Sequence, residues 1–189
     1  GGLITALRRA GWQGAIDLAS LEPYVSRQTR REMPELGVRH VLSIQAAREA
    51  TRKGGYRLVA IAGGPLMSPI FELYDLLGLF TEASAAQTPR AILGCGIGPL
   101  GYSPQRDNAI ARLLQLSVVT VLRDRASLQL AQTQLRFRGD AGVELDPAFV
   151  WADSERQAAG EIARQDTVLL ALREWQPHEY GAGLTEREA

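Results

Sequence analysis

The stretch Ala91-Ile92-Leu93-Gly94-Cys95-Gly96-Ile97-Gly98-Pro99-Leu100 joins a short apolar run to a loop with three alternating glycines. The run is nearly continuous rather than alternating, which is typical of a strand that helices bury on both faces. Functional sites in open α/β sheets lie outside the carboxyl ends of the strands, which is where this loop begins. The segment therefore predicts a buried parallel strand that runs into a glycine-lined loop.

Similar apolar runs recur on both sides of this stretch, and helical patterns separate several of them. Strands that alternate with helices indicate a doubly wound, Rossmann-like parallel sheet with right-handed crossovers. The strand candidates are residues 15–18, 40–44, 57–62, 91–95, 118–122, 142–145 and 167–172, and the helix candidates are residues 70–86, 105–115, 126–135 and 152–165.

The bulk composition excludes several classes of protein. The 189 residues are 46% apolar, and 21 basic residues balance 21 acidic ones, so no net field attracts nucleic acid or an anionic membrane. The single cysteine, Cys95, allows no internal disulfide and fits a reducing compartment. No apolar run reaches the ~18 residues of a membrane span, and no signal peptide is recognisable. We expect a soluble, cytoplasmic protein with at most peripheral membrane contact.

The two ends suggest a piece of a longer protein. Gly1-Gly2 leads directly into a helical pattern at residues 3–7, whereas an α/β domain usually begins with a strand, so we expect one strand to be missing in front. We place a domain boundary near Trp151. Residues 1–151 would form an N-terminal Rossmann-like domain, and residues 152–189 a linker and the start of a truncated second domain.

Two glycine-rich strand ends are candidate binding loops. Gly63-Gly64 follows the run at 57–62, and glycines there let backbone amides approach a ligand; a tight turn without a ligand is the alternative. Gly96 and Gly98 continue a pattern like the start of a dinucleotide fingerprint, but prolines interrupt the helix start that NAD binding needs. We therefore expect no cofactor and no metal, and a loop that lies against a ligand or a neighbouring strand. Cys95 between glycines reads as a small buried thiol.

A third strand end carries charge. The strand at 118–122 ends in Arg123, and Asp124 can accept amide hydrogens as the N-cap of the helix that follows. A guanidinium beside a helix N-terminus favours an anion. The alternative is an arginine that pairs structurally with Asp124 or another carboxylate.

The fourth strand end is Leu145-Asp146-Pro147-Ala148-Phe149. Pro147 favours an extended conformation for Asp146 and so fixes the direction of its carboxylate. The alternative is a turn in which Asp146 caps local amides. The two histidines are not site candidates, because His40 lies at a strand start and His178 follows a proline in a polar loop.

These four segments, taken in order, resemble the polysaccharide pyruvyl transferase family, and the likeness covers nearly the whole chain. That family shows a Gly-Gly turn after a strand, a Gly-x-Gly-Ile-Gly-Pro segment, a valine-rich strand that ends in Arg-Asp with a serine three residues beyond, and an Asp-Pro-Ala-Phe segment. The matching residues here are Gly63-Gly64, Gly94 to Leu100, Val118 to Ser127, and Asp146 to Phe149.

The resemblance implies the N-terminal half of an enzyme with a GT-B-like fold, in which two Rossmann-like domains face a cleft. It implies phosphoenolpyruvate as donor, and as acceptor a sugar or carrier-linked sugar of a cell-surface polysaccharide or its precursor. Arg123, Gly63, Gly64, Gly96 and Gly98 would then bind the donor, with Asp124 and Asp146 in support. The catalytic acid is expected outside this chain, so we predict that the fragment is inactive alone.

Two other functions share part of this pattern. A GT-B glycosyltransferase that uses a nucleotide sugar has the same fold, so fold alone does not separate it from a pyruvyl transferase. A non-catalytic domain that binds or assembles with partners is the third possibility, and a fully exposed Arg123 would favour it. The sequence does not identify the acceptor sugar, the linkage or the oligomeric state.

Overall fold

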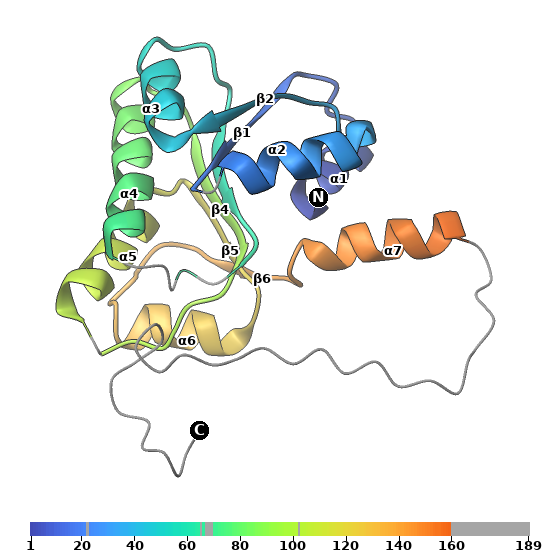
Figure 1. Cartoon of the computed structure of the whole chain (residues 1–189). Helices are drawn as coiled ribbons and strands as arrows, with labels where there is room; N and C mark the ends of the chain where they lie inside the picture. The colour runs from blue at the N-terminus through green and yellow to red at the C-terminus, as the bar shows by residue number, and fades with distance from the viewer. Residues whose placement is uncertain (22, 65, 67–69, 102, 160–189) are drawn as a thin grey trace, which may run out of the picture.

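A computed structural model describes residues 1–21, 23–64, 66, 70–101 and 103–159. Strands and helices alternate along the chain, as predicted (Figure 1). The strands are β1 Ile16–Ser20, β2 Val38–Ser43, β3 Val59–Ala62, β4 Arg90–Cys95, β5 Val119–Leu122 and β6 Gly142–Val143. The helices are α1 Gly2–Arg9, α2 Pro23–Glu32, the 3-10 turn η1 Pro34–Leu36, α3 Ile44–Arg52, α4 Ile70–Ala85, α5 Pro104–Leu116, α6 Arg125–Thr133 and α7 Ala148–Ala159.

All strand pairings within the described part of the chain are parallel, which confirms an α/β protein with parallel strands. The strands form two sheets instead of the single sheet expected from the sequence. One sheet has the order β1-β2, and the other has the order β3-β4-β5-β6. Figure 1 shows α3, α4 and α5 on one side of the strands, with α1, α2 and α7 on the other. Helices therefore cover both sides, as a doubly wound arrangement requires.

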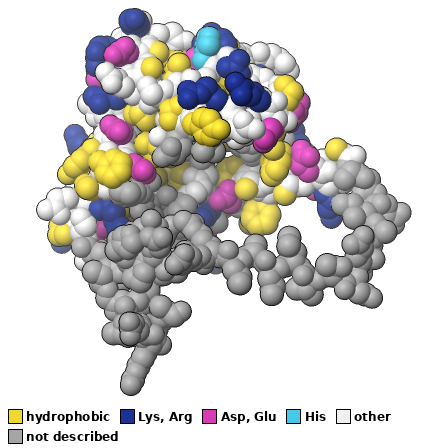
Figure 2. All heavy atoms as spheres, in the orientation of Figure 1, with side chains coloured by type: hydrophobic (Ala, Val, Ile, Leu, Met, Phe, Trp, Pro, Cys, Tyr) yellow, Lys and Arg dark blue, Asp and Glu magenta, His cyan; other side chains and the backbone are white. Residues whose placement is uncertain are grey.

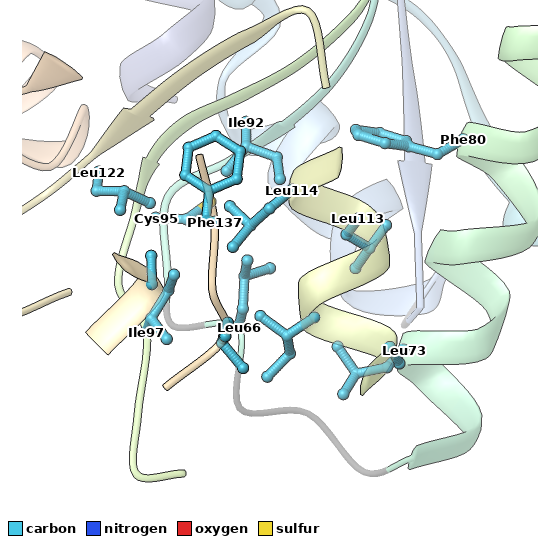
Figure 3. Close-up of a cluster of buried hydrophobic side chains, with 14 residues drawn as sticks. Leu66, Leu73, Phe80, Ile92, Cys95, Ile97, Leu113, Leu114, Leu122 and Phe137 are labelled. Atoms are coloured by element: carbon cyan, nitrogen blue, oxygen red, sulfur yellow. The ribbon is translucent and has the colours of Figure 1, made fainter. Parts of the chain in front are cut away.

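The main core lies between the four-stranded sheet and helices α4 and α5 (Figure 3). Leu73 and Phe80 stand two turns apart on α4 and are fully buried, as are Ile92 on β4 and Leu122 on β5. Fully burying an aliphatic or aromatic side chain contributes about 1.5–3 kcal/mol, so this cluster anchors β4 and β5 firmly. The loops that follow these two strands consequently leave a rigid base.

Most predicted elements agree with the structure to within a residue or two, and some differ. The strand expected at 40–44 ends at Ser43, whose hydroxyl accepts a hydrogen bond from the Ala46 amide and so caps α3, a helix that the sequence reading missed. Helix α2 was also missed. The strand expected at 142–145 is reduced to Gly142–Val143, and the strand expected at 167–172 lies outside the described residues.

The expected domain boundary falls inside a helix. Trp151 lies in α7, and α7 packs against α1 at the beginning of the chain. The ring of Trp151 lies beside Gly1, and Gly2 packs tightly against Pro147 just before α7. The division into two domains, and the GT-B arrangement, stay predictions.

Candidate functional site

The glycine-rich loops after β3 and β4 are joined by backbone hydrogen bonds beyond the strand ends. The Gly63 amide donates to the Leu93 carbonyl at 3.0 Å, and the Gly96 amide donates to the Gly64 carbonyl at 3.0 Å. The Gly96 carbonyl in turn accepts from the Leu66 amide at 2.8 Å. Gly63 and Gly64 both have positive φ, which glycine adopts without strain. The glycines therefore let two loops approach each other, and the Gly63 and Gly96 amides are already used in that contact.

Arg123 lies directly beside these loops. Its amide donates to the Cys95 carbonyl at 3.0 Å, and its guanidinium rests over Gly96, where a methyl group would lie 2.6 Å from Nη2. The side chain is 37% exposed, and Nε lies 3.4 Å from Asp124 Oδ2, on a carboxylate that is itself 44% exposed. A long contact to a half-exposed partner holds an arginine weakly. The Arg123 guanidinium is thus placed by Gly96 and retains donors for an anion.

Asp124 and Ser127 fix the start of α6. Asp124 Oδ1 accepts from the Ser127 amide at 2.6 Å, and this hydrogen bond holds the pKa of Asp124 below its ordinary value. The buried Ser127 hydroxyl accepts from the Ile97 amide at 2.9 Å. The serine three residues beyond the aspartate therefore joins the loop after β4 to the helix after β5.

Helix α5 holds the far end of the glycine loop. Arg106 is almost completely buried, and its Nη2 donates to the Pro99 carbonyl at 2.7 Å. Asp107 Oδ2 accepts from the Gly101 amide at 2.8 Å. The space beside Gly98 is taken by the Leu130 side chain of α6, 3.0 Å from where a methyl group would stand. Gly98 therefore packs against α6, and its role in donor binding stays a prediction.

Asp146 approaches the same edge from the loop after β6. Its Oδ1 accepts from the Ala148 amide at 3.0 Å and caps α7, while it lies 3.6 Å from where a methyl group on Gly63 would be. Pro147 packs against Gly94, where φ is +67° and no side chain fits. The alternative in which Asp146 caps a local amide is borne out, and its carboxylate also borders Gly63.

Cys95 forms the buried floor below these loops. Its side chain is fully buried, and Sγ lies 3.4 Å from the Gly63 carbonyl oxygen. Burial is the main cause that raises the pKa of Cys95 to about 12. A thiol with this pKa is not a nucleophile at neutral pH, so the expectation of a buried, inert cysteine is confirmed.

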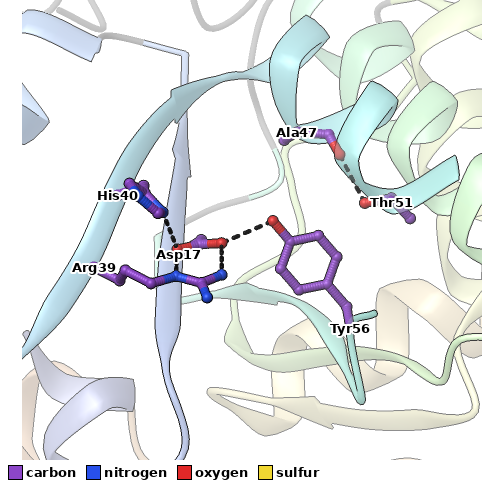
Figure 4. A network of polar contacts seen from close by, with 6 residues as sticks. All are labelled: Asp17, Arg39, His40, Ala47, Thr51 and Tyr56. Carbon is purple, nitrogen blue, oxygen red and sulfur yellow. Dashed lines mark hydrogen bonds and ion pairs between the residues drawn. The ribbon is translucent and has the colours of Figure 1, made fainter. Parts of the chain in front are cut away.

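One polar cluster was not foreseen from the sequence and lies at the other end of the strands. The Asp17 side chain on β1 is only 6% exposed, and its carboxylate accepts two hydrogen bonds from the Arg39 guanidinium, at 2.9 and 2.6 Å (Figure 4). Asp17 Oδ2 also accepts a hydrogen bond from the Tyr56 hydroxyl at 2.9 Å, and Asp17 Oδ1 lies 3.1 Å from His40 Nδ1. The Arg39 hydrogen bonds, the largest cause, hold the pKa of Asp17 far below its ordinary value. Burial and the Asp17 hydrogen bond raise the pKa of Tyr56 to about 12. Because these residues stand at strand starts, the cluster is structural, as expected for His40.

A hollow of about 610 Å³ opens elsewhere on the molecule. It lies at the carboxyl ends of β1 and β2 and is lined by Ser20, Ser43, Gln45, Arg48 and Asp75, among others. None of the predicted site residues lines it. Arg48 and Arg52 beside it are already held by Glu82 on α4, at 3.5 and 2.7 Å.

The described residues bear on metal binding and on membrane insertion. Within the part of the chain that the structure describes, no three His, Cys, Asp or Glu side chains gather closely enough to hold a metal ion. Acidic and basic side chains are interspersed on the face shown in Figure 2. Among the described residues, no helix is both long and apolar enough to cross a bilayer.

The fold and the site define an α/β protein whose parallel strands bring an arginine, two carboxylates and two glycine-lined turns to one edge of a sheet. Arg123, Gly63, Gly64 and Gly96 share that edge, as predicted, and Asp146 lies beside Gly63 there. The model of the polysaccharide pyruvyl transferase family matches residues 22–180. The chain therefore belongs to this family of transferases. No curated protein and no solved structure is detectably similar to it.

Proposed function

We propose that this chain forms the donor-binding part of an enzyme that transfers a pyruvyl group from phosphoenolpyruvate to a sugar of a cell-surface polysaccharide or its precursor. Family membership supports the transferase class and the sugar acceptor. The observation that supports a donor site is Arg123, a partly exposed guanidinium with only a 3.4 Å contact to Asp124, at the edge where the glycine loops meet. A reducing, cytoplasmic location belongs to the same proposal.

The reaction explains why an arginine is needed. Protonation of the methylene carbon of phosphoenolpyruvate makes its neighbouring carbon electrophilic, and a sugar hydroxyl attacks that carbon and loses its proton. A second hydroxyl of the same sugar then forms the second C–O bond as phosphate leaves, and it gives up its proton, which leaves a cyclic ketal. The donor carries a carboxylate and a phosphate throughout, and the planar Arg123 fork matches either group bidentately.

Asp124 and Asp146 support the proposed donor site by holding neighbouring segments in place. Asp124 directs its carboxylate toward the Ser127 amide and so keeps α6 and Arg123 in register. Asp146 caps α7 and places a negative charge beside Gly63. A donor anion would be attracted to Arg123 and repelled by Asp146. The general acid comes from another part of the enzyme, because the described histidine, His40, stands at the opposite strand ends.

The test is Arg123→Ala and Arg123→Lys in the protein that contains both halves, with phosphate release and melting temperature measured on the same samples. A charge-assisted hydrogen bond contributes about 1.5–3 kcal/mol, so Arg123→Ala should lower kcat/KM for phosphoenolpyruvate about ten- to a hundredfold. Arg123→Lys should recover part of the loss. Melting temperature should change little, because Arg123 holds no buried carboxylate.

Arg125→Ala is the matched control, since it removes an exposed arginine two residues away on α6. Donor kinetics equal to the parent in Arg123→Ala would remove Arg123 from the donor site. Turnover of a nucleotide sugar in place of phosphoenolpyruvate would instead favour a glycosyltransferase.

A further inference from the structure

The proposed reaction needs a group that accepts the proton of the attacking sugar hydroxyl. The general acid that protonates the methylene carbon cannot be that group, because it must carry a proton when the step begins. A positioned base contributes about 10²–10⁴-fold to such a step, provided that it lies within hydrogen-bond reach of the hydroxyl. The base should therefore be an ionised group at the carboxyl edge of the sheet with an oxygen or nitrogen that is free to accept a proton.

Asp146 has one carboxylate oxygen held in place and the other available. Its Oδ1 accepts from the Ala148 amide at 3.0 Å, and its carbonyl accepts from the Phe149 amide at 2.9 Å, so side chain and backbone are both fixed at the start of α7. Oδ2 makes no hydrogen bond to any residue that the structure describes, and Asp146 is partly exposed. An ionised carboxylate oxygen of this kind is a hydrogen-bond acceptor that a ligand can reach.

Asp124, the other carboxylate at this edge, is less suited to take a proton. Its Oδ1 accepts from the Ser127 amide at 2.6 Å, and its Oδ2 lies 3.4 Å from Arg123 Nε. The Ser127 hydrogen bond, the largest cause, holds the pKa of Asp124 below its ordinary value. Because a carboxylate with a lowered pKa is a weaker base, Asp146 is the better candidate of the two.

Asp146 and Arg123 flank the same short segment at the end of β4. Pro147, which follows Asp146 directly, fills the space beside Gly94, and the Arg123 guanidinium fills the space beside Gly96. These two glycines are about 6.6 Å apart in an extended chain, so the two charged groups are separated by a distance on the order of 10 Å.

The charges of Asp146 and Arg123 both act on the Cys95 thiol between these glycines. Burial is the largest cause that raises the pKa of Cys95 to about 12, while the Asp146 carboxylate adds to the rise and the Arg123 guanidinium opposes it. Both charges therefore lie near one point of the edge.

The reactants fit the span between Arg123 and Asp146. A guanidinium holds a donor carboxylate oxygen at about 2.8 Å, and the carbon that is attacked lies about 2.4 Å from that oxygen. The attacking hydroxyl oxygen stands about 3–3.5 Å from the carbon, and its base about 2.6–3.2 Å beyond. Laid end to end these steps cover about 11 Å, which agrees with a separation on the order of 10 Å.

We propose that Asp146 is the catalytic base that accepts the proton of the attacking sugar hydroxyl. This inference rests on the proposed function. The hydroxyl oxygen forms its bond to the central carbon of phosphoenolpyruvate as the general acid protonates the methylene carbon, and the hydroxyl proton passes to Asp146 Oδ2. When the bond to phosphate then breaks, the departing phosphate takes the proton of the second hydroxyl, and Asp146 returns its proton to water. The negative charge of Asp146 disfavours the donor anion and so leaves Oδ2 to the neutral hydroxyl.

The test is Asp146→Asn in the protein that contains both halves. Asparagine keeps an oxygen for the Ala148 amide and serves a helix start as well as aspartate does, so the melting temperature should stay within about 2 °C of the parent. The base is lost, so kcat for phosphate release from phosphoenolpyruvate should fall about 10²–10⁴-fold. The KM for phosphoenolpyruvate should not rise, and phosphoenolpyruvate should raise the melting temperature as it does in the parent, because Arg123 is intact.

Two further variants separate binding from proton transfer. Asp140→Asn makes the same chemical change at an exposed residue of the loop before β6, and it should match the parent in every measurement. Arg123→Ala should lose the rise in melting temperature that phosphoenolpyruvate causes, whereas Asp146→Asn should keep it.

Parental kcat in Asp146→Asn would overturn the proposal. A fall in kcat that comes with an equal loss of folding stability and of phosphoenolpyruvate binding would also overturn it, since Asp146 would then be a structural cap alone. An impaired Arg123→Ala beside a fully active Asp146→Asn refutes only the base. A parent that neither binds nor consumes phosphoenolpyruvate refutes the proposed function and the base with it.

Discussion

Replacing Gly96 by alanine tests the position of Arg123 without altering the arginine itself. Gly96 does not have positive φ, so its backbone accepts a side chain. The added methyl group would lie 2.6 Å from Arg123 Nη2, which forces the guanidinium to move. The move breaks only the 3.4 Å contact to Asp124, worth about 0–1 kcal/mol, and the reduced freedom of the unfolded chain returns about 0.4–1 kcal/mol.

We therefore expect the melting temperature of Gly96→Ala to stay within about 4 °C of the parent, since 1 kcal/mol shifts it by about 2–4 °C at this size. Donor use should fall about ten- to a hundredfold, because Arg123 loses its resting place beside the loops. The assay is phosphate release from phosphoenolpyruvate by the protein with both halves, combined with thermal unfolding.

Alanine substitutions at two other glycines serve as controls for Gly96→Ala. A methyl group on Gly142 would meet Val121 at an ordinary 3.7 Å, so Gly142→Ala should match the parent in both measurements. A methyl group on Gly94 would stand 2.7 Å from Pro147 Cγ, in a backbone with φ of +67°. The left-handed conformation alone costs about 1–2 kcal/mol, or about 2–8 °C, and the clash with Pro147 lowers the melting temperature of Gly94→Ala further.

Parental donor kinetics in Gly96→Ala would refute the reasoning that the position of Arg123 over Gly96 matters for the donor. A melting loss as large as that of Gly94→Ala would show that the guanidinium belongs to the scaffold.

Three other predictions follow from the described contacts. Folding lowers the pKa of Asp17, so the ionised carboxylate stabilises the folded state above the ordinary pKa of 3.8, and this stabilisation is lost as pH falls toward the lowered pKa. Asp17→Asn should lower the free energy of unfolding by about 1–2 kcal/mol at pH 7. It should also make that free energy depend less on pH below about pH 4. Ser127→Ala should cost about 1–3 kcal/mol in urea unfolding, because the Ile97 amide loses its acceptor, whereas Thr133→Ala at the exposed end of α6 should cost less. The 189-residue chain alone should release no phosphate from phosphoenolpyruvate in the presence of an acceptor sugar, and steady acceptor-dependent release would contradict the division of the site between two halves.

The sequence predicted the parts of the fold that depend on local apolar pattern. Strands β4 and β5 lie within the runs 91–95 and 118–122 almost as predicted, because Ile92, Cys95 and Leu122 pack into the main core and the apolar runs that contain them are visible in the sequence. Helix α2 was missed because it is mostly polar and shows no apolar stripe. Helix α3 could have been found, since Ile44, Ala47 and Thr51 are buried at helical spacing behind the capping Ser43.

The site was predictable in position but not in detail. The rule that parallel strands share a carboxyl edge was enough to group Arg123 with Gly63 and Gly96. The sequence did not reveal that the glycine amides bond to each other's loops, because those bonds join residues some 30 positions apart. The Asp17 cluster was missed for the same reason, since Tyr56 and Arg39 meet Asp17 only after β1 and β2 pair.

Because Cys95 is buried, a second cysteine introduced on the surface can be labelled selectively in the folded protein. The thiol is fully enclosed and its pKa is raised to about 12, so maleimide reagents should leave it untouched in the folded state. A cysteine introduced at an exposed residue such as Arg125 would then be the one reactive thiol, with no need to remove the native one. Fluorophores or spin labels attached there could report whether α6 moves when phosphoenolpyruvate is added. Under denaturing conditions Cys95 itself becomes reactive, and its rate of labelling would time the opening of the β4–β5 core.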